Sequence, residues 1–111
     1  MTKPFVSESN VPPRHFPDRW SKDLIGTAAL PTTSGFNLGR ANYTAEEFGE
    51  PQVHADQEAV YVISGVGEVR IGDEVVALEP GTAFYVGPGV KHCARRTGEE
   101  PVEVVYTHGA I

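Results

Sequence analysis

The stretch Gln52-Val53-His54-Ala55-Asp56-Gln57-Glu58 gathers side chains that bind transition metals, and His92 follows further along, behind a turn at Gly87-Pro88-Gly89. Gln52 and His54 are two residues apart, so on a strand they point to the same face. Two imidazoles and one carboxylate form a facial triad that suits Fe(II), Mn, Ni or Zn, and the neutral amide of Gln52 could complete the set. The stretch therefore predicts a small metal site between neighbouring β-hairpins.

The sequence around this stretch is rich in turn-forming residues. The chain has 111 residues, of which 40% are hydrophobic and 22% charged, which is typical of one soluble globular domain. Its 12 Gly and 9 Pro favour many short strands over a few long helices. The strands that we expect are residues 24–30, 36–43, 52–54, 58–63, 66–71, 75–78, 82–86, 91–97 and 102–107. Their alternating pattern predicts an all-β fold, a closed or nearly closed antiparallel barrel or jelly roll, which leaves few strand edges unpaired.

The beginning of the chain has a different composition. Residues 1–20 carry four prolines, so we expect an extended N-terminal arm followed by a barrel domain over residues 21–111. Residues 44–50 are acidic and are expected to form one helical turn or a loop.

The charge and the cysteine count exclude several classes of partner. A net charge of −6 argues against nucleic acid or an anionic membrane as the main partner, because both attract basic surfaces. The chain has no apolar run that approaches the roughly 20 residues needed to span a bilayer, and its first residues lack the apolar stretch of a signal peptide. Because Cys93 is the only cysteine, an internal disulfide framework is excluded. We therefore expect a cytoplasmic protein.

The spacing of the metal-capable residues resembles the two motifs of the cupin superfamily, in particular those of a small single-domain cupin. The first motif reads His-x-His, three or four residues, Glu, six residues, Gly; here three residues separate His54 from Glu58, and six separate Glu58 from Gly65. In the second motif a glycine is followed by five residues, Pro-x-Gly, two residues and His. Here Gly81 is followed by five residues, then Gly87-Pro88-Gly89, two residues and His92.

The family's first motif also begins with a glycine and five further residues before His-x-His, but no glycine lies at that distance before Gln52, and Gly49 is the nearest. The sequence departs from the motifs at three further positions. The first motif histidine is Gln52 here, the motif proline is Gly87, and the motif asparagine is Arg96. An alternative register would pair His54 with Asp56 as ligands, but it leaves one residue between Asp56 and Glu58 and so breaks the family spacing.

The resemblance implies a divalent transition metal (Fe, Mn, Ni or Zn) inside the barrel, bound by His54, Glu58 and His92, with Gln52 as a possible fourth ligand. It implies a metalloenzyme acting on a small organic acid, sugar acid or phenolic compound, either a dioxygenase or a redox-neutral isomerase, lyase or decarboxylase. Glu58 could leave the metal and act as a base. The alternatives are a non-catalytic module that binds a small ligand without an essential metal, and a structural protein with a filled interior. Small cupins commonly form homodimers, so a homodimer is expected.

Three further residues are candidates for substrate binding. Arg40 and Asn42 share a face of the strand expected at 36–43, and Arg40 could bind a substrate carboxylate in a bidentate manner if that face points into the barrel. The other reading places this face toward solvent at a subunit rim. Tyr106 is an aromatic residue on the last expected strand and a candidate for the pocket mouth.

Overall fold

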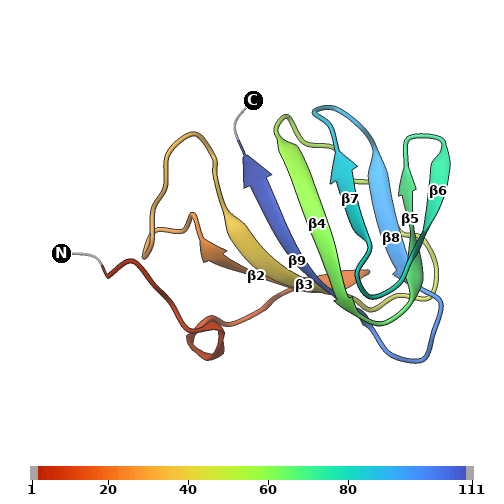
Figure 1. Cartoon of the computed structure of the whole chain (residues 1–111), viewed down its shortest axis with the longest axis horizontal. Helices are drawn as coiled ribbons and strands as arrows, with labels where there is room; N and C mark the ends of the chain where they lie inside the picture. The colour runs from red at the N-terminus through yellow and green to blue at the C-terminus, as the bar shows by residue number, and fades with distance from the viewer. Residues whose placement is uncertain (1–2, 110–111) are drawn as a thin grey trace.

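Two antiparallel β-sheets face each other and form the body of the molecule (Figure 1). The computed structural model describes residues 3–109. The strands are β1 (Arg14–Phe16), β2 (Arg19–Ile25), β3 (Leu38–Tyr43), β4 (Gln57–Ser64), β5 (Gly67–Ile71), β6 (Glu74–Leu78), β7 (Ala83–Val86), β8 (His92–Arg96) and β9 (Val102–Gly109), preceded by a 3-10 turn, η1 (Glu8–Asn10). The expected all-β, jelly-roll type of fold is confirmed.

The strand order brings the last strand into the middle of the larger sheet. That sheet has the order β1-β2-β3-β9-β4-β7, and the smaller one has the order β6-β5-β8. β9 therefore pairs with β3 on one side and with β4 on the other. Long loops join β2 to β3 and β3 to β4, whereas a sharp turn joins β4 to β5 at Gly65, where a φ of 87° favours glycine. This arrangement places residues that are distant in the sequence beside one another in the sheet.

The hydrophobic core lies between the two sheets. Alternate residues of each strand point inward, so that Val62 and Val104 of neighbouring strands are completely buried. The smaller sheet supplies the opposing side chains. The buried residues of this core are Ala41, Val60, Val62, Val69, Leu78, Ala94, Val102, Val104 and Tyr106. Toward the ends of β4 and β9 the same alternation points polar side chains inward, among them Glu58 and His108.

The N-terminal region differs from the sequence-based expectation. The strand expected at 24–30 is wrong beyond residue 25: it overlaps only the end of β2, which stops at Ile25 because Gly26 adopts a left-handed φ of 93° and its N–H donates to the carbonyl of Leu30. Residues 14–16 also form a strand, paired with β2. The boundary expected between residues 20 and 21 thus falls inside β2. The segment expected at 44–50 is a loop.

The outer face of the larger sheet is apolar along β4 and β7. Tyr61 and Tyr85 are 53% and 57% exposed, and Ile63 is 42% exposed. Ala59 faces Tyr85, and Tyr61 faces Ala83, across the two strands. We call Ala59, Tyr61, Ile63, Ala83 and Tyr85 the outer apolar face. Among residues 3–109, the structure has no helix that is long and apolar enough to cross a membrane.

Candidate metal centre

Glu58 and His108 occupy opposite positions on paired strands. Glu58 on β4 pairs directly with His108 on β9, and two residues further along Val60 pairs with Tyr106. Val60 and Tyr106 belong to the core, so the period-2 alternation directs Glu58 and His108 inward as well. The site therefore lies at the end of the core, on the same inner face of the sheet.

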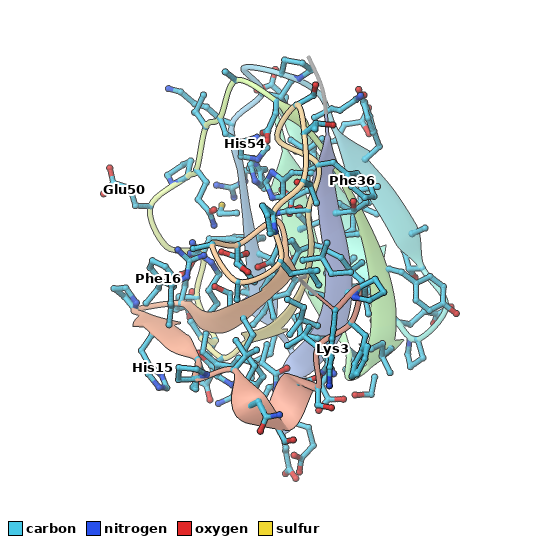
Figure 2. The ribbon with its side chains drawn as sticks, turned by 90° about the vertical axis from the view of Figure 1, so that its left-hand side faces the viewer. Lys3, His15, Phe16, Phe36, Glu50 and His54 are labelled. Atoms are coloured by element: carbon cyan, nitrogen blue, oxygen red, sulfur yellow. The ribbon has the colours of Figure 1, made fainter. Side chains whose placement is uncertain are left out.

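The side chains of His54 and His92 approach the end of the core from the side opposite to Glu58 and His108. Gln52 and His92 form an isolated antiparallel bridge with backbone N–H···O distances of 2.7 and 3.0 Å. The N–H of Gly89 donates to the carbonyl of His54 at 2.9 Å. These bonds hold the loop before β4 against the beginning of β8. Figure 2 shows His54 at one end of the molecule, whereas Lys3 and His15 lie toward the other end.

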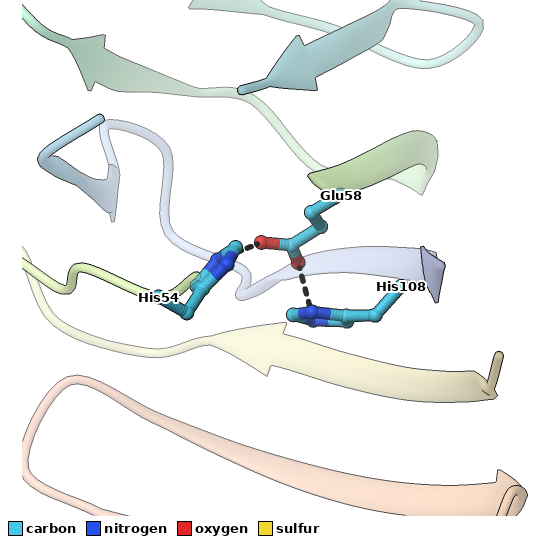
Figure 3. Close-up of side chains that lie close together, drawn as sticks. All are labelled: His54, Glu58 and His108. Atoms are coloured by element: carbon cyan, nitrogen blue, oxygen red, sulfur yellow. Dashed lines mark hydrogen bonds and ion pairs between the residues drawn. The ribbon is translucent and has the colours of Figure 1, made fainter. Parts of the chain in front are cut away.

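Three imidazoles converge on the carboxylate of Glu58. The Nε2 atom of His54 lies 3.1 Å from Glu58 Oε1, and His92 Nε2 lies 3.4 Å from the same oxygen. His108 Nε2 lies 3.4 Å from the other oxygen, Oε2 (Figure 3). Potential ligand atoms of His54, Glu58 and His108 are all within 4.8 Å of one another. The rings of His54 and His92 also meet edge to face, with centroids 4.9 Å apart.

The Nδ1 atom of each ring, which points away from Glu58, lies beside an acceptor oxygen. His92 Nδ1 donates to the carbonyl of Val90 at 3.1 Å. His54 Nδ1 lies 2.7 Å from Asp56 Oδ1, and His108 Nδ1 lies 3.2 Å from that same oxygen. Because these oxygens can only accept, each Nδ1 carries a proton and each Nε2 is the nitrogen turned toward Glu58. Histidine ligands of metals are commonly held in this way.

The charges in the cluster are strongly coupled. Burial alone would raise the pKa of Glu58, but hydrogen bonds from His108 and His92 outweigh it and lower that pKa to about 2. The hydrogen bond to Glu58, opposed by burial and supported by Asp56, raises the pKa of His108 to about 9. In the metal-free protein, Glu58 is thus an anion and His108 a cation over the neutral pH range.

A cavity of about 260 Å³ opens beside the cluster, between the two sheets. Its walls include the rings of Tyr43, Phe84 and Tyr106, and its polar end includes Glu58 and His108. Burial raises the pKa of the Tyr43 hydroxyl, so this phenol stays protonated. Arginine–aspartate pairs line it as well: Arg14 binds Asp23, and Arg19 binds Asp18, each at 2.8 Å.

The structure brings together most, but not all, of the residues that the sequence singled out. His54, Glu58 and His92 meet, and Gln52 lines the cavity next to them. Tyr106 also lines the cavity, and its hydroxyl donates to Asp23 at 2.5 Å.

Arg40 and Asn42 are not brought to the site. Their neighbours Ala41 and Tyr43 line the cavity, so the alternation of β3 turns Arg40 and Asn42 to the other face of the sheet. There Arg40 binds Glu8 at 3.0 Å and the carbonyl of Val104 at 3.1 Å. Asn42 is buried on this face, and its Oδ1 atom accepts no hydrogen bond from residues 3–109.

His108 is the site residue that the sequence interpretation missed. The last strand was expected to end at Thr107, whereas β9 continues to Gly109. Val104 and Tyr106 alternate with outward residues, and continuing that alternation by one step would have placed His108 inside. With His108, the cluster has three histidines and one carboxylate without counting Gln52.

The chain matches the sequence model of the cupin domain over residues 40–108, and it belongs to the cupin family. The matched segment extends from β3 to β9 and so contains His54, Glu58, His92 and His108. The expected membership of the cupin superfamily is confirmed.

Individual proteins resemble the chain in sequence or in fold. It is 29% identical over 102 residues to the tetracenomycin polyketide synthase protein TcmJ of Streptomyces glaucescens, covering 91% of this chain and 68% of that protein. An RmlC-like cupin from Shewanella frigidimarina superposes with a TM-score of 0.78 at 16% identity, covering 100% of this chain and 96% of the other. A variant of Bacillus subtilis oxalate decarboxylase gives a TM-score of 0.82 at 19% identity over 99% of this chain, which spans 30% of that larger chain. The two structures share the fold with this protein.

The donor set fits a divalent transition metal. Imidazole nitrogen suits Fe, Ni and Zn, and one carboxylate adds negative charge and suits Mn or Fe. His54, Glu58 and His108 would hold the ion, because their donor atoms lie close to one another, and His92 would join them through Nε2, which lies beside Glu58 Oε1. This cupin domain therefore contains a possible binding site for a divalent transition metal.

Proposed function

We propose that this cupin is a metal-dependent enzyme that acts on a small organic acid or phenolic compound in the cavity beside the histidine cluster. The observation that carries the proposal is the convergence of three Nε2 atoms on one carboxylate, at 3.1 to 3.4 Å, with each Nδ1 already bonded elsewhere. A bound Fe, Mn, Ni or Zn ion would act as a Lewis acid toward an oxygen of the substrate. We assign its binding to His54, Glu58, His92 and His108.

The role of Glu58 is better supported as ligand than as base. A carboxylate with a pKa of about 2 accepts a proton poorly near neutral pH. A carboxylate that binds a metal must be deprotonated, and Glu58 is deprotonated throughout the neutral pH range. In this proposal, Glu58 balances the charge of the ion and fixes its position between β4 and β9.

The cavity walls favour a planar substrate. Tyr43, Phe84 and Tyr106 offer aromatic surface next to the polar end at His108. The S. glaucescens relative is named as a protein of a polyketide synthase, which supports a phenolic or polyoxygenated compound over a sugar acid for this chain. Gln52 lines the same cavity and would hydrogen-bond the substrate from beside His92.

Turnover of a defined compound panel tests the proposal. Protein loaded separately with Fe(II), Mn(II), Ni(II) or Zn(II) is incubated with phenolic acids, hydroxy acids and sugar acids, with and without O₂, and products are read by mass spectrometry. We expect product from wild type and none from His92→Ala, with His15→Ala, on the exposed strand β1, as the matched histidine control. Ligand binding without turnover, unchanged after metal removal, would instead identify a binding module.

We also propose that two copies of the chain associate through the outer apolar face. Tyr61, Ile63 and Tyr85 lie on neighbouring strands, are each more than 40% exposed, and surround the small side chains of Ala59 and Ala83. A contiguous apolar surface of this kind marks an interaction site in a soluble protein, and a twofold dimer is the commonest way to cover it.

A further inference from the structure

The geometry points to Asp56 as a positioning residue that holds two of the metal-binding histidines at once, an inference that rests on the proposed metal site. One oxygen, Oδ1, lies 2.7 Å from His54 Nδ1 and 3.2 Å from His108 Nδ1. The two rings lie with their centroids 4.8 Å apart. A single carboxylate oxygen therefore contacts two imidazoles that belong to different segments of the chain: it accepts a hydrogen bond from His108 Nδ1 and lies within ion-pair distance of His54 Nδ1.

His54 has a particular need for such a contact. It lies in the loop before β4, so no regular strand pairing fixes the direction of its ring. Its backbone carbonyl is held by Gly89, while its ring is held by the side chain of Asp56 and also by the Asp56 carbonyl at 3.1 Å. Without the Asp56 side chain, Nδ1 of His54 would keep only its bond to the backbone carbonyl of residue 56.

His108 is held in two complementary ways. Asn37 fixes its backbone, since Asn37 Oδ1 accepts from the His108 N–H at 2.5 Å and the Asn37 N–H donates to the His108 carbonyl at 3.0 Å. Asp56 fixes its ring. Because Nδ1 donates to Asp56, Nε2 is the nitrogen presented to Glu58 at 3.4 Å. His92 does not share this support, since its Nδ1 donates to Val90.

This arrangement explains why an acidic residue within the ligand stretch is not itself a ligand. Asp56 lies behind the two imidazoles, on the Nδ1 side, whereas Glu58 lies in front of them, on the Nε2 side. A carboxylate in this position orients the ligands and makes them better electron donors, and its loss in comparable sites weakens metal binding by about 10- to 100-fold.

The test compares Co²⁺ binding to wild type, Asp56→Ala, Asp56→Asn and a control, Asp73→Ala, which changes an exposed aspartate in the turn between β5 and β6. Affinity is measured by chelator competition, and the ligand field by the visible absorption spectrum of the bound ion. We expect Asp56→Ala to bind about 10- to 100-fold more weakly with an altered spectrum. The amide oxygen of Asp56→Asn can still accept from the rings, so its Co²⁺ affinity should stay closer to that of wild type. Asp73→Ala should bind Co²⁺ as tightly as wild type.

Crystal structures of the metal-free wild type, Asp56→Ala and Asp56→Asn separate this inference from the metal proposal. The ring of His108, whose Nδ1 bonds only the Asp56 side chain, should rotate in Asp56→Ala, and both rings should keep their wild-type orientation in Asp56→Asn. Absence of Co²⁺ binding by wild type would overturn the proposed metal site, and the ring orientations would still decide the role of Asp56. Wild-type affinity and spectrum in Asp56→Ala, or an unrotated His108 ring in its crystal structure, would overturn the inference. So would rotated rings in Asp56→Asn.

Discussion

Glu58 and His108 face each other across β4 and β9, and their side chains form an ion pair with a separation of 3.4 Å between Oε2 and Nε2. The two residues are 50 positions apart in the sequence, and only the return of the last strand to the centre of the larger sheet brings them together. This pair joins the motif residues His54 and His92 to a strand that contributes neither cupin motif.

The ion pair predicts a specific pH dependence for the stability of the metal-free protein. The pKa of His108 is raised to about 9, so its stabilising contribution is complete below its ordinary pKa of about 6.5 and is lost as the pH rises through 9. The pKa of Glu58 is lowered to about 2, so its contribution is complete above about 4.5 and is lost as the pH falls toward 2. Both contributions are therefore complete between about pH 4.5 and 6.5.

Urea unfolding of metal-free protein from pH 3 to 10 measures this dependence. The His108→Gln variant should lose the decline in stability between about pH 6.5 and 9, whereas His15→Ala should keep it. An identical decline in wild type and His108→Gln would show that another group causes it.

A second pH effect concerns the metal. An ion that binds His108 must displace its proton, so the apparent Co²⁺ affinity should rise about tenfold per pH unit between 6.5 and 9 if this proton alone is released. Chelator competition at a series of pH values measures the slope. Affinity that is already constant above pH 7 would contradict the raised pKa of His108 or its role as ligand.

Gly39 provides a test of packing at the cavity wall. A Cβ atom at this position would lie 2.2 Å from Cζ of Tyr106 and 2.6 Å from the carbonyl of Lys22, so the ring or the strand would have to move. We expect Gly39→Ala to lower the free energy of unfolding by about 1–3 kcal/mol, as overpacking typically does. At Gly49, a Cβ atom would meet its neighbours only at 3.5 Å or more, so Gly49→Ala serves as the control. Equal stability of the two variants would contradict the close contact between Gly39 and Tyr106.

The outer apolar face predicts the oligomeric state. Size-exclusion chromatography with light scattering should give the mass of a dimer for wild type and a monomer for Tyr61→Arg, because an unpaired buried charge opposes association. Val75 is a similarly exposed hydrophobic residue, 49% exposed on β6 of the smaller sheet, and Val75→Arg should remain dimeric. Wild type that stays monomeric at micromolar concentration would contradict the proposed interface.

The second half of the chain was predictable from its sequence because glycine and proline mark its turns. From β4 to β8 the observed strands lie within about one residue of the expected ones, and His54, Glu58 and His92 meet as their spacing indicated. In the first half, the prolines concealed β1, and the left-handed Gly26 ended β2 earlier than the apolar run did.

Two predictions about the site were wrong, one about the face of a strand on which a residue lies and one about where a strand ends. Arg40 was a pocket candidate only if its face pointed inward, but β3 presents Ala41 and Tyr43 to the cavity instead. His108 was missed because the end of β9 was placed one residue before it. Neither a strand end nor its inward face is fixed by local sequence, since both depend on how distant strands pair.

The most direct test of the central claim is the metal content of purified, tag-free protein, measured by mass spectrometry for wild type, His108→Ala and Gln52→Ala after reconstitution with Fe, Mn, Ni or Zn. We expect close to one metal per chain in wild type and in Gln52→Ala, and little in His108→Ala, because three histidines and Glu58 supply the ligands. A full complement of metal in His108→Ala, or no metal in wild type with any of the four ions, would contradict the account.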